Sequence, residues 1–515
     1  MVAPASIPQN TRRAAITSVS APIGGWNARD SLAEMQPLDA VTLDNWWPGT
    51  SSVILRNGYT EHATGLPDQV ETLMAYSSAT SEKLFAVSAG GIYDVTSAGA
   101  VGSAAVSSLS NSRFQYANFT TTGGSYLVCI NGADKQQIYD GSSWHKDGDG
   151  SPYNISNLDT SKANSVVVFK HYLFYTAGTL KAWYLPINAI GGAATGLDMS
   201  SLATRGGYLI AGMTWTLDAG YGIDDYLVFI TSRGEAFVWQ LTDPTTPSGI
   251  ALIGVYYFGS PIGQRPWIKY AGDLLILTQD GIVPLSAGLQ SSRLDPRVSI
   301  TNKIQFAISS SEQLYGSNFG WQMLTVPKYN QLYLNVPVME GSQQIQYVQN
   351  NITAAWCSFS GWAANCWELF QDEPYFGGNT VVNMAWQGHD DNGASIQAFA
   401  IQAFQSFGDA SEKQAKMIRY HFLTDGSPTL YGNVNVNYDL SDNSAELNSL
   451  NPGFGVWDTA VWDTDIWGAG LGPSADWDTA TGVGYVFAPT LKTATNGIQV
   501  QWLSTDLVLE PGGAL

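Results

Sequence analysis

Short hydrophobic runs alternate with glycine-containing turns through most of this chain, from about residue 66 to residue 390. In a representative stretch, the apolar runs 83–87 and 92–95 flank a turn at residues 89–91. Runs of about four to eight apolar, β-branched or aromatic residues between such turns are typical of β-strands joined as hairpins. The pattern therefore predicts a mainly β protein with few short helices.

The same hairpin recurs at a roughly regular interval along the chain. Its turn glycines are separated by 41, 46, 56 and 47 residues and are Gly91, Gly132, Gly178, Gly234 and Gly281. A degenerate period of about 40 to 55 residues built on hairpins indicates a β-propeller, with about one four-stranded blade per repeat. We expect about five to seven blades; an irregular β-sandwich of hairpins is the alternative that spacing leaves open.

Segments on either side of this pattern complete the predicted organisation. Residues 1–65 form an N-terminal arm that leads into a β-rich platform, and residues 66–390 form the propeller-like domain. Residues 391–515, where strictly alternating strands return, form a C-terminal platform or docking domain. Apolar residues at helical spacing predict a helical insertion near 299–314 and a second helix at 395–407.

The N-terminal segment 24–59 has a local pattern of its own. Pro37 suits the first turn of a short helix that would carry Leu38, Val41 and Trp46 on one face. Residues 53–55 then predict a strand closed by a hairpin turn at Asn57-Gly58. We therefore expect a helix followed by a hairpin at this point.

A tryptophan repeat interrupts the C-terminal domain. The sequence Trp-Asp-Thr recurs within residues 456–480, and the tryptophans here fall on a five-residue step at Trp457, Trp462, Trp467 and Trp477, with Gly472 at the one missing place. This step matches neither the strand period nor the helix period. It predicts an ordered loop anchored within the subunit by tryptophans. A docking surface for another protein and an aromatic platform for sugar are the alternatives.

Charged residues are sparse and mainly acidic. They make up 13% of the chain, against about 25% in average globular proteins. Uncharged polar surface suits a subunit enclosed by neighbours, because charges are depleted from the cores of interfaces. The formal net charge of -20 disfavours attraction to nucleic acid or anionic lipid, but it is compatible with a passage along which DNA slides without binding.

No motif with a known chemical mechanism occurs in the sequence. Walker-type, H-E-x-x-H and G-x-S-x-G patterns are absent, and none of the five histidines has a partner at metal-ligand spacing. Cys129, Cys357 and Cys366 show no paired spacing and are expected to be buried free thiols. We expect no enzyme activity, metal or cofactor. Since no apolar run of about 18 residues and no signal pattern is found, we expect no membrane insertion.

The segment 24–59 also resembles a known family. It contains Gly-Gly-Trp-Asn, Pro-Leu-Asp-Ala, Asn-Trp and Leu-Arg-Asn-Gly in this order, a set similar to the first part of the tail nozzle (tail hub, tubular tail) proteins of short-tailed bacteriophages. Two further blocks, residues 253–286 and 351–367, look like the central region of these proteins and the blade that follows it. The resemblance touches about a quarter of the positions and spreads over three quarters of the length.

The resemblance implies a structural virion protein of the phage tail, assembled in the host cytoplasm. Six subunits, each with a propeller and a β platform, would form a ring below the portal and adaptor proteins. This head-to-tail connector would extend the DNA-ejection channel, help to retain packaged DNA and dock tail fibres or spikes. Acidic residues are expected to line the channel, through which genomic DNA passes without specific binding. A receptor- or carbohydrate-binding propeller at the tail tip is the alternative function.

Two groups of residues are candidates for contacts within this assembly. The candidates for subunit or adaptor contacts are Trp26, Asn27, Asp39, Asn45, Trp46 and Arg56. The candidates for a docking loop are Trp457, Trp462, Trp467 and Trp477.

Overall fold

The computed structural model describes residues 14–218, 223–290, 298–448 and 471–511. The chain forms two compact units, which are described separately. The larger unit comprises residues 59–348 and 360–387, and the smaller comprises residues 1–58, 349–359 and 388–515. The chain therefore passes between the units four times. The outer limits of the larger unit lie near the predicted limits of 66 and 390, and both ends of the chain contribute to the smaller unit.

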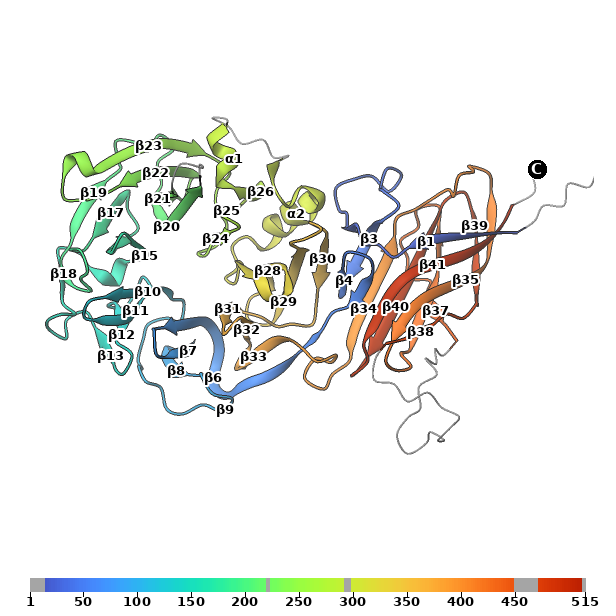
Figure 1. The fold of residues 1–515 in the computed structure, drawn as a ribbon, viewed down its shortest axis with the longest axis horizontal. Helices are drawn as coiled ribbons and strands as arrows, with labels where there is room; N and C mark the ends of the chain where they lie inside the picture. The colour runs from blue at the N-terminus through green and yellow to red at the C-terminus, as the bar shows by residue number, and fades with distance from the viewer. Residues whose placement is uncertain (1–13, 219–222, 291–297, 449–470, 512–515) are drawn as a thin grey trace, which may run out of the picture. The chain divides into compact units, whose positions relative to one another are not determined.

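The larger unit is a β-propeller, in which small antiparallel sheets follow one another around a ring (Figure 1). Three sheets have four strands each. The first contains β10 (Gln115–Thr121), β11 (Gly124–Ile130), β12 (Gln137–Tyr139) and β13 (Trp144–Lys146). The second contains β15 (Ser165–Phe169), β16 (Tyr172–Thr176), β17 (Lys181–Tyr184) and β19 (Thr195–Asp198). The third contains β20 (Leu209–Asp218), β21 (Ile223–Thr231), β22 (Glu235–Leu241) and β23 (Ile250–Tyr257).

Further strands continue the ring. One sheet contains β24 (Trp267–Tyr270), β25 (Asp273–Thr278) and β26 (Gly281–Pro284). The next strands to pair are β27 (Gln322–Val326), β28 (Gln331–Met339) and β29 (Gln343–Asn350). The last are β31 (Cys366–Phe370), β32 (Glu373–Gly377) and β33 (Asn379–Gln387).

The ring is closed by β6 (Gly58–Ser77), the longest strand. It pairs with β33 from the end of the propeller and with β7 (Glu82–Ser88), which in turn pairs with β8 (Gly91–Asp94). At this seam the Val70 N–H donates to the Gly378 carbonyl at 3.0 Å. The first and last strands of the propeller thus share one sheet.

The predicted turn glycines confirm the repeat. Each lies in or beside the turn between the second and third strands of its sheet: β7 and β8, β11 and β12, β16 and β17, β21 and β22, or β25 and β26. Gly234 shows why glycine is needed there. Its φ is +76°, and a Cβ at this position would lie 2.3 Å from the Phe258 carbonyl oxygen. A side chain would therefore clash with the backbone as well as strain the turn.

Adjoining sheets of the propeller pack through apolar side chains. Every residue of β16 is buried, because its alternate side chains face the sheets on either side. One cluster joins Phe174 and Tyr184 to Phe229 and Phe237 of the following sheet, and the rings of Phe174 and Phe229 lie 6.2 Å apart. The core is therefore a series of layers between sheets.

The smaller unit contains two sheets. One contains β1 (Ala15–Ser20), β4 (Trp46–Pro48), β5 (Val53–Leu55), β35 (Lys413–Thr424), β38 (Gly472–Ser474), β39 (Asp478–Gly484) and β41 (Val500–Pro511). The other includes β2 (Gly25–Trp26), β3 (Asp39–Asp44), β30 (Trp356–Phe359), β34 (Ile396–Gln402), β36 (Leu430–Val436), β37 (Ala445–Glu446) and β40 (Phe487–Thr495). The Tyr420 ring of the first sheet packs 6.0 Å from Trp502, and its hydroxyl donates to the Thr490 carbonyl of the second sheet.

Helices and short strands fill the connections. The α-helices are α1 (Leu285–Gln290) and α2 (Gln305–Tyr315). Among the described residues, 3-10 turns include Thr160–Lys162, Pro247–Gly249, Asn302–Ile304 and Pro327–Tyr329. Two-residue strands of the larger unit are β9 (Gly99–Ala100), β14 (Ile155–Ser156) and β18 (Gly192–Ala193). α2 confirms the helical insertion predicted near residues 299–314.

Two local predictions in the N-terminal segment were wrong. The expected helix after Pro37 is strand β3 followed by β4, because β3 pairs with β34 and buries Ala40 and Leu43. The expected hairpin at Asn57-Gly58 does not form either. β5 pairs with β4 and β41, whereas β6 pairs with strands of the propeller. Long-range pairing therefore overrides the local turn signal.

The helix expected at residues 395–407 was also wrong. This segment contains β34, which lies between β3 and β40 in the second sheet. Ile396, Ala398 and Ala400 are buried at alternate positions, and Ile401 is buried as well. A strand covered on both faces has apolar residues at so many positions that a helical stripe can be read from it.

The seam that closes the propeller can be tested at Gly377. A Cβ there would lie 2.6 Å from Val70 Cγ1 and 2.7 Å from Cys366 Sγ. Gly377→Ala should therefore lower the free energy of unfolding by about 1 to 3 kcal/mol, measured by urea denaturation. Gly102→Ala is the matched control, since no atom lies within 4 Å of that Cβ. Equal stability of the two variants would contradict tight packing at the seam.

Candidate functional site

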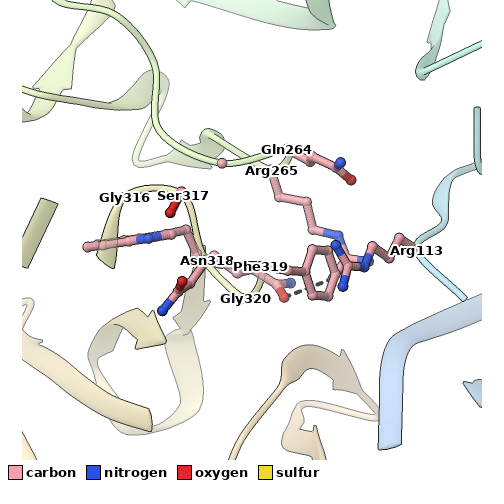
Figure 2. Close-up of a pocket in the computed structure, with 11 residues that line it drawn as sticks. Arg113, Gln264, Arg265, Gly316, Ser317, Asn318, Phe319 and Gly320 are labelled. Atoms are coloured by element: carbon pink, nitrogen blue, oxygen red, sulfur yellow. Dashed lines mark hydrogen bonds between the residues drawn. The ribbon is translucent and has the colours of Figure 1, made fainter. Parts of the chain in front are cut away.

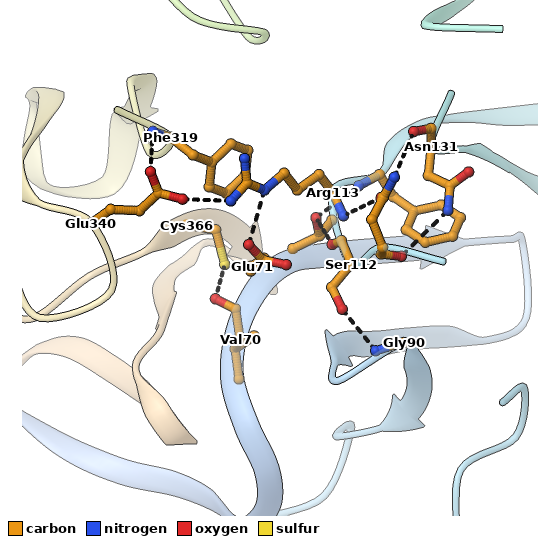
Figure 3. Close-up of polar contacts among 12 residues, drawn as sticks. Val70, Glu71, Gly90, Ser112, Arg113, Asn131, Phe319, Glu340 and Cys366 are labelled. Atoms are coloured by element: carbon orange, nitrogen blue, oxygen red, sulfur yellow. Dashed lines mark hydrogen bonds and ion pairs between the residues drawn. The ribbon is translucent and has the colours of Figure 1, made fainter. Parts of the chain in front are cut away.

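An arginine-centred cluster lies where several sheets of the propeller meet (Figure 3). Arg113, just before β10, donates from Nε to Glu71 of β6 at 2.9 Å and from Nη2 to Glu340, just after β28, at 2.5 Å. Its guanidinium carbon lies 4.2 Å from the centroid of the Phe319 ring, and the Phe319 N–H donates to Glu340 at 3.2 Å. One side chain thus joins segments that are distant in the sequence.

Arg265 lies beside this cluster, just before β24 (Figure 2). Its guanidinium donates to Gln322 Oε1 at 3.1 Å, to Thr72 Oγ1 at 2.8 Å and to the Phe114 carbonyl at 2.9 Å. All three acceptors are neutral. Among the residues that the structure describes, no carboxylate forms an ion pair with Arg265. Its hydrogen bonds thus go to neutral groups, although the charges of Glu368 and Glu71 also act on it.

A cavity of about 270 Å³ opens next to Arg265. Its lining comes from β6, β10, β24, β27 and β31, or from residues directly before them, and these five strands belong to four sheets, since β6 and β31 share one. The residues that line it are Leu73, Phe114, Gln115, Tyr116, Arg265, Trp267, Ile268, Lys269, Gln322, Met323, Leu324, Trp367 and Glu368. Apolar walls with a few charged groups are typical of small-molecule sites.

The charged groups of this cavity titrate abnormally. Burial raises the pKa of Glu368 to about 7, although Tyr116 and the charge of Arg265 act in the opposite direction. Burial also raises the pKa of Tyr116 well above its usual value and lowers the pKa of Lys269. Glu368 is therefore only partly ionised near neutral pH, and the cavity carries a net positive charge in a protein whose net charge is -20.

The three cysteine thiols are not reactive nucleophiles. Cys129, Cys357 and Cys366 are buried and free, as predicted. Burial raises the pKa of the Cys366 thiol to about 12 and those of the other two well above the usual value. A buried thiol of high pKa is a poor nucleophile, because the thiolate is the reactive form.

The described part of the chain contains neither a metal-type cluster nor a membrane-spanning helix. No group of three or more His, Cys, Asp or Glu side chains within it could hold a metal ion. None of its helices is both long enough and apolar enough to cross a membrane. The arrangement at the propeller centre is suited to holding sheets together and to binding an anion.

The structure places the six predicted contact residues within the smaller unit. Five of them expose 2% or less of their surface and only Trp26 is half-buried; the five are Asn27, Asp39, Asn45, Trp46 and Arg56. Asn27 Nδ2 donates to Asp39 at 2.8 Å, and the rings of Trp46 and Trp502 lie 5.9 Å apart. These side chains therefore have an internal role. That they contact another subunit or an adaptor stays a prediction.

Arg56 is the centre of the buried polar groups in this segment. Its two Nη atoms donate to the two carboxylate oxygens of Asp391 at 2.8 and 2.7 Å, and Nε donates to Asn45 at 2.7 Å. Asn45 in turn donates to the Gln397 carbonyl at 2.6 Å. Arg56 thus links the N-terminal strands to the segment that returns from the propeller.

Most of the tryptophan repeat lies outside the described residues. Trp457, Trp462 and Trp467 fall in the undescribed segment 449–470. Trp477 is half-buried, and the Arg419 guanidinium lies 4.4 Å from its ring centroid. At this one position the contact agrees with anchoring within the subunit, and docking by the remainder stays a prediction.

The cluster at the propeller centre was missed by sequence reasoning. Its members lie between residues 71 and 368 and share no spacing motif. One weak signal is present, since Arg113 and Arg265 each come two residues before the first strand of a sheet. In a chain with only 23 basic residues, two arginines at the same place in the repeat could have drawn attention.

Known proteins give little further guidance. No protein-family model matches the chain, and no curated protein matches its sequence. The structure of BBS1N in complex with ARL6DN, soaked with lead, is 10% identical and covers 45% of this chain and 74% of its own, with a TM-score of 0.31. The computationally designed Ika8 protein is 9% identical over 64% of this chain and 100% of its own, with a TM-score of 0.36. Similarity at this level carries no information on function.

Glu368 should make stability depend on pH. Its folded-state pKa of about 7 exceeds the usual 4.5, so the native state binds more protons than the unfolded state between these values. The protonated Glu368 side chain therefore stabilises the native state relative to the ionised one. This stabilisation is complete below pH 4.5 and is lost as pH rises to about 7. Glu368→Gln cannot ionise at this position. The free energy of unfolding of the variant, relative to that of wild type, should therefore be higher at pH 8 than at pH 5 by about 1 to 3 kcal/mol.

Urea denaturation at the two pH values measures this gain. Glu82→Gln, at an exposed position of the same unit, is the control and should show the same pH dependence as wild type. If Glu368→Gln also follows wild type, the buried carboxyl does not carry the effect.

The ion pair of Arg56 and Asp391 should be essential to the smaller unit. Arg56→Gln leaves Asp391, whose side chain is 11% exposed, without its bidentate partner. The expected loss in free energy of unfolding is about 3 to 5 kcal/mol, measured by urea denaturation. In Lys492→Gln, which removes an exposed pair with Asp442, the expected loss is below about 1 kcal/mol. Comparable losses in both variants would refute the special role of Arg56.

Proposed function

We propose that this protein is a structural, non-enzymatic subunit of the tail of a short-tailed bacteriophage. In this role it forms part of a nozzle or hub ring below the portal and adaptor. The observation that carries the proposal is the combination of a propeller with a second β unit built from both ends of the chain. A propeller together with a β platform is the architecture that the sequence resemblance implies.

The segments that carry the resemblance contribute to both units. Residues 24–59 supply β2 to β5 of the smaller unit. Residues 253–286 supply most of β23, all of β24 to β26 and the start of α1 in the propeller. The resemblance therefore concerns the framework of both units and not a single local motif.

Composition supports a place inside an assembly. Only 13% of the residues are charged, and the net charge is -20. Few charges favour extensive contact with neighbouring subunits, since each buried charge must be desolvated. An acidic channel wall would repel phosphates and let the genome slide through during ejection. Adaptor, fibre and spike proteins are the partners that this role requires.

The rotational symmetry of the particle tests the proposal. Electron microscopy of the purified full-length protein, or of the phage tail that contains it, should show a six-fold ring with one copy of this chain per subunit. A monomer that binds glycans on an array would favour the receptor-binding alternative and contradict the nozzle. A ring whose lumen is lined mainly by Lys and Arg would contradict the expected passage of DNA.

A further inference from the structure

The cavity at the propeller centre has unused binding capacity. Arg265 makes its hydrogen bonds to neutral acceptors, and among the described residues neither it nor Lys269 forms an ion pair. Two cations therefore line one cavity, while Glu368, the one carboxyl in its lining, is only partly ionised near neutral pH because burial raises its pKa to about 7. Lys269 is exposed and Arg265 half-buried, so the cavity offers accessible positive charge in a protein whose net charge is -20, and an anion is the complementary ligand.

The walls of the cavity restrict the class of ligand. Trp267, Leu73, Met323 and Leu324 line it beside the two cations, so one part of a bound molecule would contact apolar side chains. The volume of about 270 Å³ lies just below that of typical sites for drug-sized ligands, which begin at roughly 300 Å³. The ligand must therefore be small, with a negative group at one end and an apolar body.

We propose that this cavity binds a small organic carboxylate, with the carboxylate beside Arg265 and Lys269 and the apolar body against Trp267. The Arg265 guanidinium gives both N–H groups of Nη2 and one of Nη1 to neutral acceptors, and a remaining N–H can donate one charge-assisted hydrogen bond to a carboxylate. The same chemistry is available from a free acid or from the C-terminal carboxylate of a short peptide. This binding does not depend on the proposed role in the phage tail.

The proposal includes a dependence on pH. Arg265, just before β24, and Tyr116 on β10 act on Glu368, while Lys269 of β24 lines the same cavity. The carboxylates that act on the two cations besides Glu368 are Glu71 of β6 on Arg265 and Asp225 of β21 on Lys269. As pH rises through about 7, the carboxylate of Glu368 repels the ligand more strongly. Lys269, whose pKa burial lowers, changes the affinity in the same direction. Binding should therefore weaken several-fold from pH 6 to pH 8, and Glu368→Gln should reduce this change.

Isothermal titration calorimetry of the full-length protein tests the proposal with benzoate as the probe. Benzamide is its neutral counterpart of similar shape and should bind at least about tenfold more weakly, since it lacks charge-assisted hydrogen bonds. Benzoyl-glycine and a short peptide with a free C-terminus, each titrated separately, distinguish a free acid from a peptide end. Equal affinity for benzoate and benzamide, or no binding of any of these carboxylates, would overturn the proposal.

Variants locate the site. Arg265→Gln should weaken benzoate binding roughly tenfold, and Lys269→Gln should weaken it by a smaller factor. Lys83→Gln, which removes a half-buried cation of the same unit that pairs with Asp94 outside the cavity lining, should leave the affinity unchanged. Because Arg265 also joins several sheets, its variant could fail to fold. Lys269→Gln, together with the benzoate and benzamide pair on wild type, then decides the question. Unchanged affinity in a folded Lys269→Gln variant would place the ligand elsewhere.

Discussion

The propeller depends on the pairing of β6 with two partners. One is β7, which follows it directly, and the other is β33, which comes after every other strand of the ring. Joining segments separated by roughly 300 residues costs about 5 kcal/mol in loop-closure entropy. The strand pairing, the Val70 to Gly378 hydrogen bond and the contact of Cys366 Sγ with the Val70 carbonyl at 3.3 Å must together exceed this cost.

The chemistry at the centre of the ring follows from the same closure. Glu71 and Thr72 are neighbours of Val70 on β6, and they accept hydrogen bonds from Arg113 and Arg265. A ring left open at β6 would remove acceptors from both guanidinium groups. Since buried cations without acceptors are unfavourable, the polar centre stabilises only the closed form, and closure in turn produces the cationic cavity.

The sequence predicted those features that depend on local structure. Gly234 and its counterparts each mark a turn of the repeat, and at Gly234 a left-handed backbone beside the Phe258 carbonyl leaves little choice of residue. β3 and β34 could not be recognised in the same way. They pair with each other in a sheet whose strands are far apart in the sequence. Which of their residues are apolar is therefore determined by distant strands, and a short stretch of sequence does not reveal it.

The central cluster was beyond prediction for a related reason. Arg113, Glu71 and Glu340 meet only after the ring has closed, and a pair such as Arg113 and Glu340 has no characteristic spacing. Arg56 shows the intermediate case. It belongs to a recognisable motif, but its partner Asp391 lies on the far side of the propeller in the sequence. The motif could be seen, whereas its buried ion pair could not.

The order in which the chain is synthesised has a consequence for the smaller unit. β1 and β5 leave the ribosome first, yet both pair with β41, as Ala15 with Leu509 and Ile54 with Gln501. The propeller strands find their partners earlier, and β33 completes that unit before β35 is made. Until β41 emerges, the N-terminal strands keep open edges, which are prone to association with other chains. Synthesis of β41 therefore ends the period in which the unpaired edges of β1 and β5 expose a nascent subunit to aggregation.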